Sequence, residues 1–158
     1  MTTKKAQYSA LDVAKYIIYL ASQNVIDEVK GEKLYEGITN LKLQKILYFV
    51  QVRSLIKLNK PLFEQDIQAW QYGPVVSEVY DVYKQYRRRP IVLKQDSSHL
   101  PPEVKAFLQD VWYLFGGYSV GKLVRMTHND TPWQDAIQRK HKVISQKELK
   151  TYYTSLLN

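Results

Sequence analysis

The sequence predicts a mostly α (α+β) fold, a single compact helical domain of about six or seven helices with one small β-hairpin. Three observations lead to this prediction. Apolar residues recur at intervals of three and four along most of the chain, which is the spacing of one helical face. Residue types that favour helix N-termini precede several of these segments. Strand-like patterns are confined to two short stretches, residues 62–72 and 91–93.

Length and composition narrow the class of protein. The 158 residues suffice for one domain with a hydrophobic core, and we expect residues 1–8 to form a flexible N-terminus and residues 9–158 to form the domain. The absence of cysteine excludes disulfides and thiolate metal sites and suits a reducing cytoplasm. No apolar run approaches the ~20 residues of a membrane span. We therefore expect a cytoplasmic protein that does not contact membranes.

A helix predicted over residues 40–58 forms the centre of this domain. Thr39 is a typical N-cap residue, and a proline at position 61 lies just beyond the expected C-terminus. Apolar residues cover most faces of the helix, so we expect it to be enclosed on most sides. One polar stripe remains, formed by Gln44, Tyr48 and Gln51. Two interpretations of this stripe are open, a structural element of the core or the wall of a site.

The other elements are predicted from their start and stop signals. Ser9 with Asp12 begins a helix that reaches about residue 24, and the charged residues 24–36 are expected to form a loop. Residues 62–72 are expected to form a strand that pairs with residues 91–93. The further helix starts are Pro74, the pair Pro101–Pro102 with a stop at Gly116, Ser119, Thr131 as N-cap with Pro132, and Ser145 with Glu148 as a capping box.

The net charge of +8 permits attraction to nucleic acid, to acidic lipid or to an acidic protein. The basic residues are spread along the chain with only one tight cluster, at residues 87–89, which favours scattered solubilising charge. A helix-turn-helix needs a basic recognition helix, whereas the helix expected after Pro74 carries Glu78 and Asp81. A DNA-binding regulatory protein that uses its basic surface is therefore the second hypothesis.

The sequence gives little support to catalysis. Of the three histidines, His99, His128 and His141, none has a metal-ligand spacing, and no nucleophile elbow or glycine-rich phosphate loop is present. A lone histidine such as His128 at a helix C-terminus is more typical of a structural role than of a general base. We expect no enzyme, no metal and no cofactor.

The stretch Trp70–Gln71–Tyr72–Gly73–Pro74 predicts an abrupt strand-to-helix corner. Gly73 tolerates backbone angles that a side chain forbids, and a residue before proline is pushed towards extended conformations. The rings of this stretch and of Trp133 either anchor the corner to the core or form the rim of a binding cleft. Both interpretations stay open at this point.

Three segments resemble motifs of the Panacea (PanA) family of SocA-like, phage-associated antitoxin domains. They read LKLQKILY at residues 41–48, AWQYGPVV at residues 69–76 with a tyrosine at position 80, and LVRMTH at residues 123–128 followed by a Pro-Trp pair. The candidate motif or partner-binding residues are Thr39, Leu41, Lys42, Gln44, Lys45, Tyr48, Trp70, Tyr72, Gly73, Pro74, Val75, Tyr80, Thr127, His128, Pro132 and Trp133.

The resemblance implies an antitoxin that neutralises a cognate toxin protein by direct binding and has no chemistry of its own. It also implies a possible role as a proteolytic adaptor that delivers the toxin to a bacterial AAA+ protease. Many relatives carry an additional DNA-binding domain for which this chain has no room, so we expect neutralisation rather than promoter regulation. The positive charge leads us to expect an acidic patch on the toxin.

Overall fold

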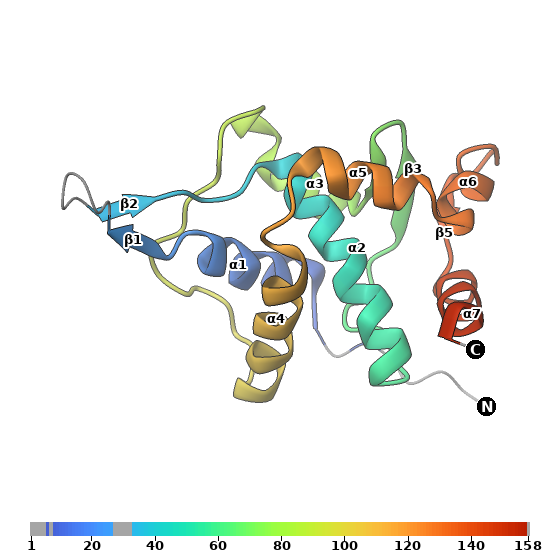
Figure 1. The fold of residues 1–158 in the computed structure, drawn as a ribbon, viewed down its shortest axis with the longest axis horizontal. Helices are drawn as coiled ribbons and strands as arrows, with labels where there is room; N and C mark the ends of the chain where they lie inside the picture. The colour runs from blue at the N-terminus through green and yellow to red at the C-terminus, as the bar shows by residue number, and fades with distance from the viewer. Residues whose placement is uncertain (1–5, 7, 27–32, 158) are drawn as a thin grey trace.

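Helix α2 (Asn40–Lys57) lies at the centre of the molecule (Figure 1). The computed structural model describes residues 6, 8–26 and 33–157. The other elements are α1 (Ala10–Ala21), β1 (Asn24–Ile26), β2 (Lys33–Tyr35), β3 (Ile67–Trp70), β4 (Gly73–Val75), α3 (Ser77–Tyr83), the 3-10 turn η1 (Lys84–Tyr86), α4 (Pro102–Phe115), α5 (Val120–His128), α6 (Thr131–Ala136), β5 (Val143–Ile144) and α7 (Gln146–Leu157). With seven α-helices in the described part of the chain and little strand, the mostly helical fold is confirmed.

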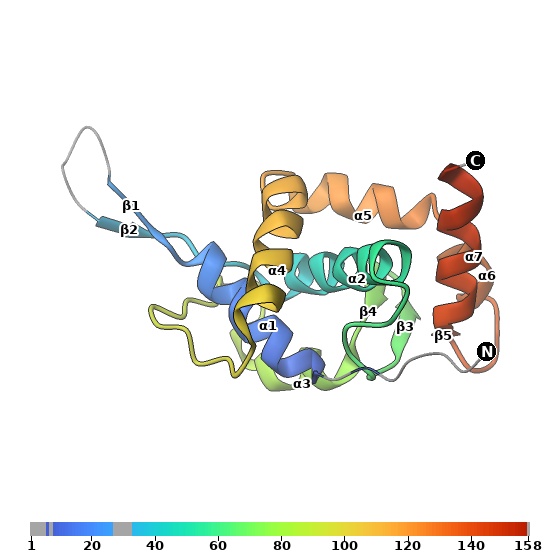
Figure 2. The same cartoon turned by 90° about the horizontal axis from the view of Figure 1, so that it is seen from below.

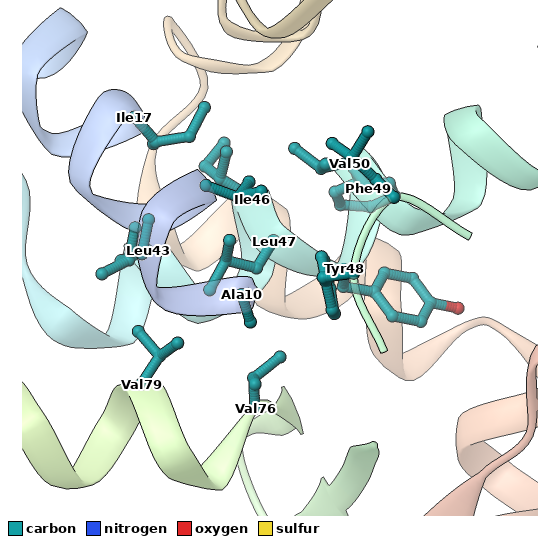
Figure 3. Close-up of a cluster of buried hydrophobic side chains, with 14 of the residues drawn as sticks. Ala10, Ile17, Leu43, Ile46, Leu47, Tyr48, Phe49, Val50, Val76 and Val79 are labelled. Carbon is teal, nitrogen blue, oxygen red and sulfur yellow. The ribbon is translucent and has the colours of Figure 1, made fainter. Parts of the chain in front are cut away.

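Helix α2 forms where the sequence predicts because its N-terminus is capped and nearly all its faces are covered. The Thr39 hydroxyl accepts a hydrogen bond from the backbone N–H of Lys42 at 3.2 Å. The helix packs against α1, α4, α5, α7 and β4. Figure 3 shows Leu43, Ile46 and Leu47 of α2 beside α1, with Val76 and Val79 from the start of α3 below them. All three side chains are fully buried, which places the core around this helix.

A three-stranded antiparallel sheet in the order β4-β3-β5 contacts α2 and α5 through β4. Figure 2 shows β3 and β4 beside α2. The predicted pairing of residues 62–72 with residues 91–93 is wrong. Strand β3 pairs instead with β4 through a tight turn, with Trp70 opposite Gly73, and with β5, where Ile67 lies opposite Ile144. Ile91 forms an isolated antiparallel bridge with Ile38. Strand β5 has only two residues, which is too short for an alternating pattern to reveal it.

The loop predicted for residues 24–36 is wrong at both ends, because β1 and β2 pair antiparallel with Asn24 opposite Tyr35. This ribbon extends away from the helices in both views (Figures 1 and 2). The middle of the predicted loop, residues 27–32, lies outside the described residues. So does most of the flexible N-terminus predicted for residues 1–8, although Tyr8 forms a parallel bridge with Phe63.

Most of the predicted helix caps are confirmed. Ser9 and Ser119 each accept a hydrogen bond from the residue three positions on, and Ser145 and Glu148 form the reciprocal pair of a capping box. Two predicted starts are wrong. Pro74 lies in the edge strand β4, where its missing N–H costs no ladder bond, and α3 begins at Ser77. The N-cap of α6 is Asp130 rather than Thr131, which is the first helical residue, and α1 ends at Ala21 rather than near residue 24.

Candidate functional site

The polar stripe of α2 is part of the core. Gln44 and Gln51 are each 1% exposed and Tyr48 is 0% exposed. The Gln51 side chain donates to the carbonyl of Phe63 at 2.8 Å and accepts from the N–H of Leu62 at 2.9 Å, which fixes the segment that leads into β3. The side-chain Oε1 of Gln44 accepts from the backbone N–H of Val76 at 2.9 Å, directly after β4. The stripe therefore satisfies buried backbone groups on both sides of the β3–β4 corner.

Three motif segments meet at one point below this corner. The fully buried Lys45 donates its Nζ to the carbonyl of Pro74 at 3.0 Å. Gly73 has φ +113, and a Cβ at this position would lie 2.7 Å from Cε of Lys45 and 2.8 Å from Oγ1 of Thr127. The first, second and third segments thus contribute Lys45, Gly73 and Thr127 to a single close contact, and only glycine fits between the other two side chains.

The burial of Lys45 has an electrostatic consequence. No carboxylate pairs with it among the residues that the structure describes. Burial lowers the pKa of the Lys45 ammonium from 10.5 to about 7, because the charged form loses its hydration. A carbonyl dipole alone supports the charge, so this lysine stabilises the corner at a considerable electrostatic cost.

A second buried cluster lies where α5 turns into α6. The carboxylate of Asp130, which is 8% exposed, accepts hydrogen bonds from the hydroxyls of Tyr48, at 2.7 Å, and Tyr153. Burial raises the pKa of Asp130, and the tyrosine hydrogen bonds oppose this change. Burial, together with the carboxylate, raises the pKa of both tyrosine hydroxyls, which keeps them protonated as donors. The cluster ties α2 and α7 to the α5–α6 turn.

Above these buried groups lies an aromatic corner, which we define as Trp70, Tyr72, His128 and Trp133. The indole N–H of Trp133 donates to the carbonyl of Trp70 at 3.0 Å, and the ring of Trp133 stacks on His128 with centroids 4.2 Å apart. His128 Nε2 lies 3.0 Å from the carbonyl of Gln71, so the imidazole also contacts the β3–β4 turn. Second-segment and third-segment residues are therefore brought together, as the cleft interpretation requires.

The aromatic corner is open to solvent. Trp70, His128 and Trp133 are half-buried, while Tyr72 is 61% exposed, and its side chain makes no hydrogen bond, ion pair or ring contact with the described residues. A groove of about 500 Å³ runs along it, lined by Ala69, Trp70, Gln71, Trp133, Ile137 and Lys142. Half-buried rings with free edges beside an open groove can contact a protein partner.

The other candidate residues have structural contacts of several kinds. Tyr80 packs edge-on against Trp70 with ring centroids 5.0 Å apart, and Val75 and Pro132 are buried. Lys42 donates to the carbonyl of Gly116 at 2.7 Å, and burial lowers its pKa. The nearby Leu41, in the first turn of α2, is 38% exposed. The first segment therefore supports the corner from below and contributes no side chain to its exposed surface.

Two groups of contributing residues were missed by the sequence interpretation. The sequence does not mark Asp130 as a candidate, because its tyrosine partners come from helices far away in the chain. Ile137 and Lys142 complete the groove beside the aromatic corner, but no motif or spacing marks them. The only sequence signal for the first group is an aspartate directly before a helix that starts with a Thr-Pro pair.

Among the described residues, no group of three or more His, Asp or Glu side chains is placed to hold a metal ion. No helix in the described part of the chain has the length and apolar character needed to cross a bilayer. A small helical fold with an exposed aromatic corner above a satisfied polar core is typical of a protein-interaction module.

The chain belongs to the family described as antitoxin SocA-like, Panacea domain, which matches residues 43–134, more than half of the sequence. It is similar to the antitoxin SocA of Caulobacter vibrioides (strain NA1000 / CB15N), with 31% identity over 117 residues. This match covers 66% of the present chain and 62% of SocA, so the chain spans less than two thirds of that relative's length. No solved structure matches the chain. The resemblance seen in the three motif segments is thereby confirmed.

Proposed function

We propose that this protein is the antitoxin of a toxin–antitoxin pair and neutralises its toxin by direct protein–protein binding, without catalysis. The observation that carries the proposal is membership in the SocA-like antitoxin family, with a relative that is named an antitoxin. The aromatic corner supports binding as the mechanism, because it offers exposed rings and a groove of about 500 Å³ beside them.

Within this proposal the candidate motif residues divide into two roles. Buried residues such as Lys45 and Tyr48 hold the turns in place, and the aromatic corner contacts the toxin. Tyrosine and tryptophan are common at the centre of protein interfaces, since they bury a large area and still form a hydrogen bond. Tyr72 is 61% exposed, and its side chain has no hydrogen bond or ring contact with the described residues, so it is the corner residue whose removal should affect the fold least.

The charge of the protein supports an acidic toxin surface. The net charge is +8, and the three arginines at residues 87–89 are exposed. Complementary charge raises the rate of association more than it tightens the final complex. We expect an acidic patch on the toxin for this reason.

Co-expression tests the proposed function. The product of the adjacent gene is expressed alone and with this protein, and growth, toxin level and co-purification are measured. Rescue of growth with a stable complex supports neutralisation by binding. Rescue with a lower toxin level indicates in addition delivery to an AAA+ protease. The proposal would be contradicted if the neighbouring gene product is toxic but this protein neither binds it nor rescues growth. It would also be contradicted if that product is harmless and this protein retards duplex DNA, which would favour the DNA-binding hypothesis.

A matched pair of variants tests the aromatic corner. Tyr72→Ala is expected to weaken toxin binding at least about tenfold, as for a central interface tyrosine, while thermal stability stays unchanged. Tyr113→Ala is the control, because Tyr113 is 88% exposed and no residue of the corner or its groove comes from its helix, α4. Figures 1 and 2 show α4 on the other side of α2 from β3 and α6. Equal binding by both variants would remove the corner from the proposed interface.

A further inference from the structure

A second apolar surface lies on the side of α2 that faces α7. It is a groove of about 520 Å³, called here the α2–α7 groove. Its apolar lining consists of Phe49, Val52, Ile56, Phe115, Met126 and Leu157. Met126 lies in the third motif segment, but none of these residues is among the candidate site residues. The groove is therefore distinct from the aromatic corner.

The floor of this groove is one face of a helix. Phe49, Val52, Arg53, Ile56 and Lys57 follow one another at intervals of three, one, three and one along α2, which places them on one stripe. At 1.5 Å per residue the stripe is about 12 Å long, or a little more than two turns. Such a stripe in a helical protein is normally covered by another helix. Here α4, α5 and α7 cover the first part of the stripe, at Phe49 and Val52, and leave Ile56 accessible from the groove.

The floor is well packed before any partner arrives. Phe49 stacks face to face on Phe115, with centroids 4.5 Å apart and an interplanar angle of 8°. Phe49 and Val52 are each 4% exposed, while Ile56 is half-buried and offers its surface to the groove. Rigid walls reduce the ordering that binding requires, so the groove suits a docked helix.

The charges around the groove indicate that it binds an acidic partner. Arg53 and Lys57 both line it, four residues apart on α2, where like charges repel. Neither forms an ion pair or a side-chain hydrogen bond with the described residues. The one acid in the lining, Asp130, is already bonded to Tyr48 and Tyr153. Carboxylates of a partner would therefore find two free cations beside an apolar floor.

We propose that the α2–α7 groove binds an acidic amphipathic helix of the cognate toxin. Its apolar side chains at positions i, i+3 or i+4, and i+7 contact the accessible apolar lining of the groove, Ile56, Phe115, Met126 and Leu157, and its carboxylates pair with Arg53 and Lys57. This inference rests on the proposed function and names the segment of the toxin that is recognised. The groove adjoins the aromatic corner, because His128 belongs to the corner while Asn129 and Asp130 line the groove. One toxin can contact both surfaces across the α5–α6 turn.

Charge reversal tests the inference with the product of the adjacent gene as the probe. The variant Arg53→Glu with Lys57→Glu removes the two cations of the groove. The control Lys140→Glu with Lys147→Glu makes the same change in net charge on exposed residues that line neither the groove nor the aromatic corner. Dissociation constants and growth rescue are measured for wild type and both variants, and thermal unfolding verifies that each is folded. If the charge reversal unfolds the protein, Arg53→Gln with Lys57→Gln replaces it, with Lys140→Gln and Lys147→Gln as its control.

We expect the groove variant to bind the toxin at least about tenfold more weakly and to lose rescue, while the control binds as wild type does apart from slower association. Equal binding by the groove variant and the control overturns the groove inference, and the proposed function stands as long as wild type binds and rescues. If wild type itself neither binds nor rescues, the proposed function fails and the groove inference fails with it. The wild-type measurement thus separates the two failures.

Discussion

Replacement of Lys45 by methionine is expected to stabilise this protein at neutral pH, although Lys45 belongs to the family motif. The side chain is completely buried and makes one hydrogen bond, from Nζ to the carbonyl of Pro74 at 3.0 Å. Methionine has a similar length and fills an irregular apolar space well. The substitution removes the buried charge with little change in packing volume.

The expected gain follows from the pKa of the lysine. A pKa of about 7 in the folded protein, compared with an ordinary value of 10.5, corresponds at about 1.4 kcal/mol per pKa unit to about 5 kcal/mol of destabilisation when the lysine is charged. Loss of the hydrogen bond leaves the Pro74 carbonyl without this donor, which costs about 1–3 kcal/mol. Below pH 7 the Lys45→Met variant should therefore be more stable by about 2–4 kcal/mol.

The pKa of Lys45 also predicts how the free energy of unfolding changes with pH. Between pH of about 7 and 10.5 the unfolded chain binds the lysine proton and the folded protein does not, so the stability of wild type rises with pH in this window. The methionine variant lacks this rise. Above pH ~10 both proteins should lose stability, because the raised pKa values of Tyr48 and Tyr153 keep those hydroxyls protonated only in the folded state.

Urea unfolding of wild type and Lys45→Met at several pH values from 6 to 9.5 measures these free energies. Lys140→Met is the control, since Lys140 is exposed and its replacement should leave the slope with pH unchanged. Identical slopes for wild type and Lys45→Met between pH 7 and 9.5 would refute the claim that Lys45 is a buried, unpaired charge. A variant that is less stable at every pH would show that the hydrogen bond to Pro74 outweighs the charge.

The remaining predictions concern the corner, the acid cluster and the toxin. Gly73→Ala should lower the free energy of unfolding by about 1–3 kcal/mol from backbone strain at φ +113, with further loss from the contact with Lys45, whereas Gly117→Ala, with open space around its Cβ, should be nearly neutral in the same urea titration. Tyr153→Phe should cost about 1.5–3 kcal/mol, the worth of a hydrogen bond to a charged group, by the same measurement, and an unchanged midpoint would contradict the role assigned to the Asp130 cluster. The association rate with the toxin, followed by stopped flow, should fall at least about tenfold between 50 mM and 500 mM salt, and a rate independent of salt would argue against an acidic patch.

The helices could be predicted because their signals are local. Thr39, Ser9, Ser119 and the Ser145–Glu148 pair each act within one turn, and the structure places all of them at helix starts. The sheet could not be predicted in the same way. Its third strand, β5, comes from a position more than seventy residues after β3 in the chain, so no local pattern joins Ile67 to Ile144.

The candidate site could be predicted only in part, because its contacts also join residues that are far apart in the chain. A polar residue on a helix such as Gln51 can face water or serve a buried backbone group, and the sequence does not reveal the partner at Leu62. The structure brings Trp70 and Trp133 together and leaves each ring half-buried, which supports the anchoring of the corner, while the binding of a partner by these rings stays a prediction. The α2–α7 groove was not foreseen, because Phe49 and Val52 read as ordinary core residues of an enclosed helix.

The division between buried and exposed motif residues has a consequence for any toxin partner. Lys45, through Pro74, and the Asp130 cluster fix the two turns that carry the rings of the aromatic corner. A surface that is fixed before binding loses less conformational entropy when a partner docks, so more of the contact energy appears as affinity. Substitutions at Tyr48 should therefore reduce neutralisation only together with stability, whereas substitutions at Tyr72 should reduce neutralisation alone. A Tyr48→Phe variant that keeps its unfolding midpoint but no longer rescues growth would show that this buried hydroxyl acts on the toxin directly.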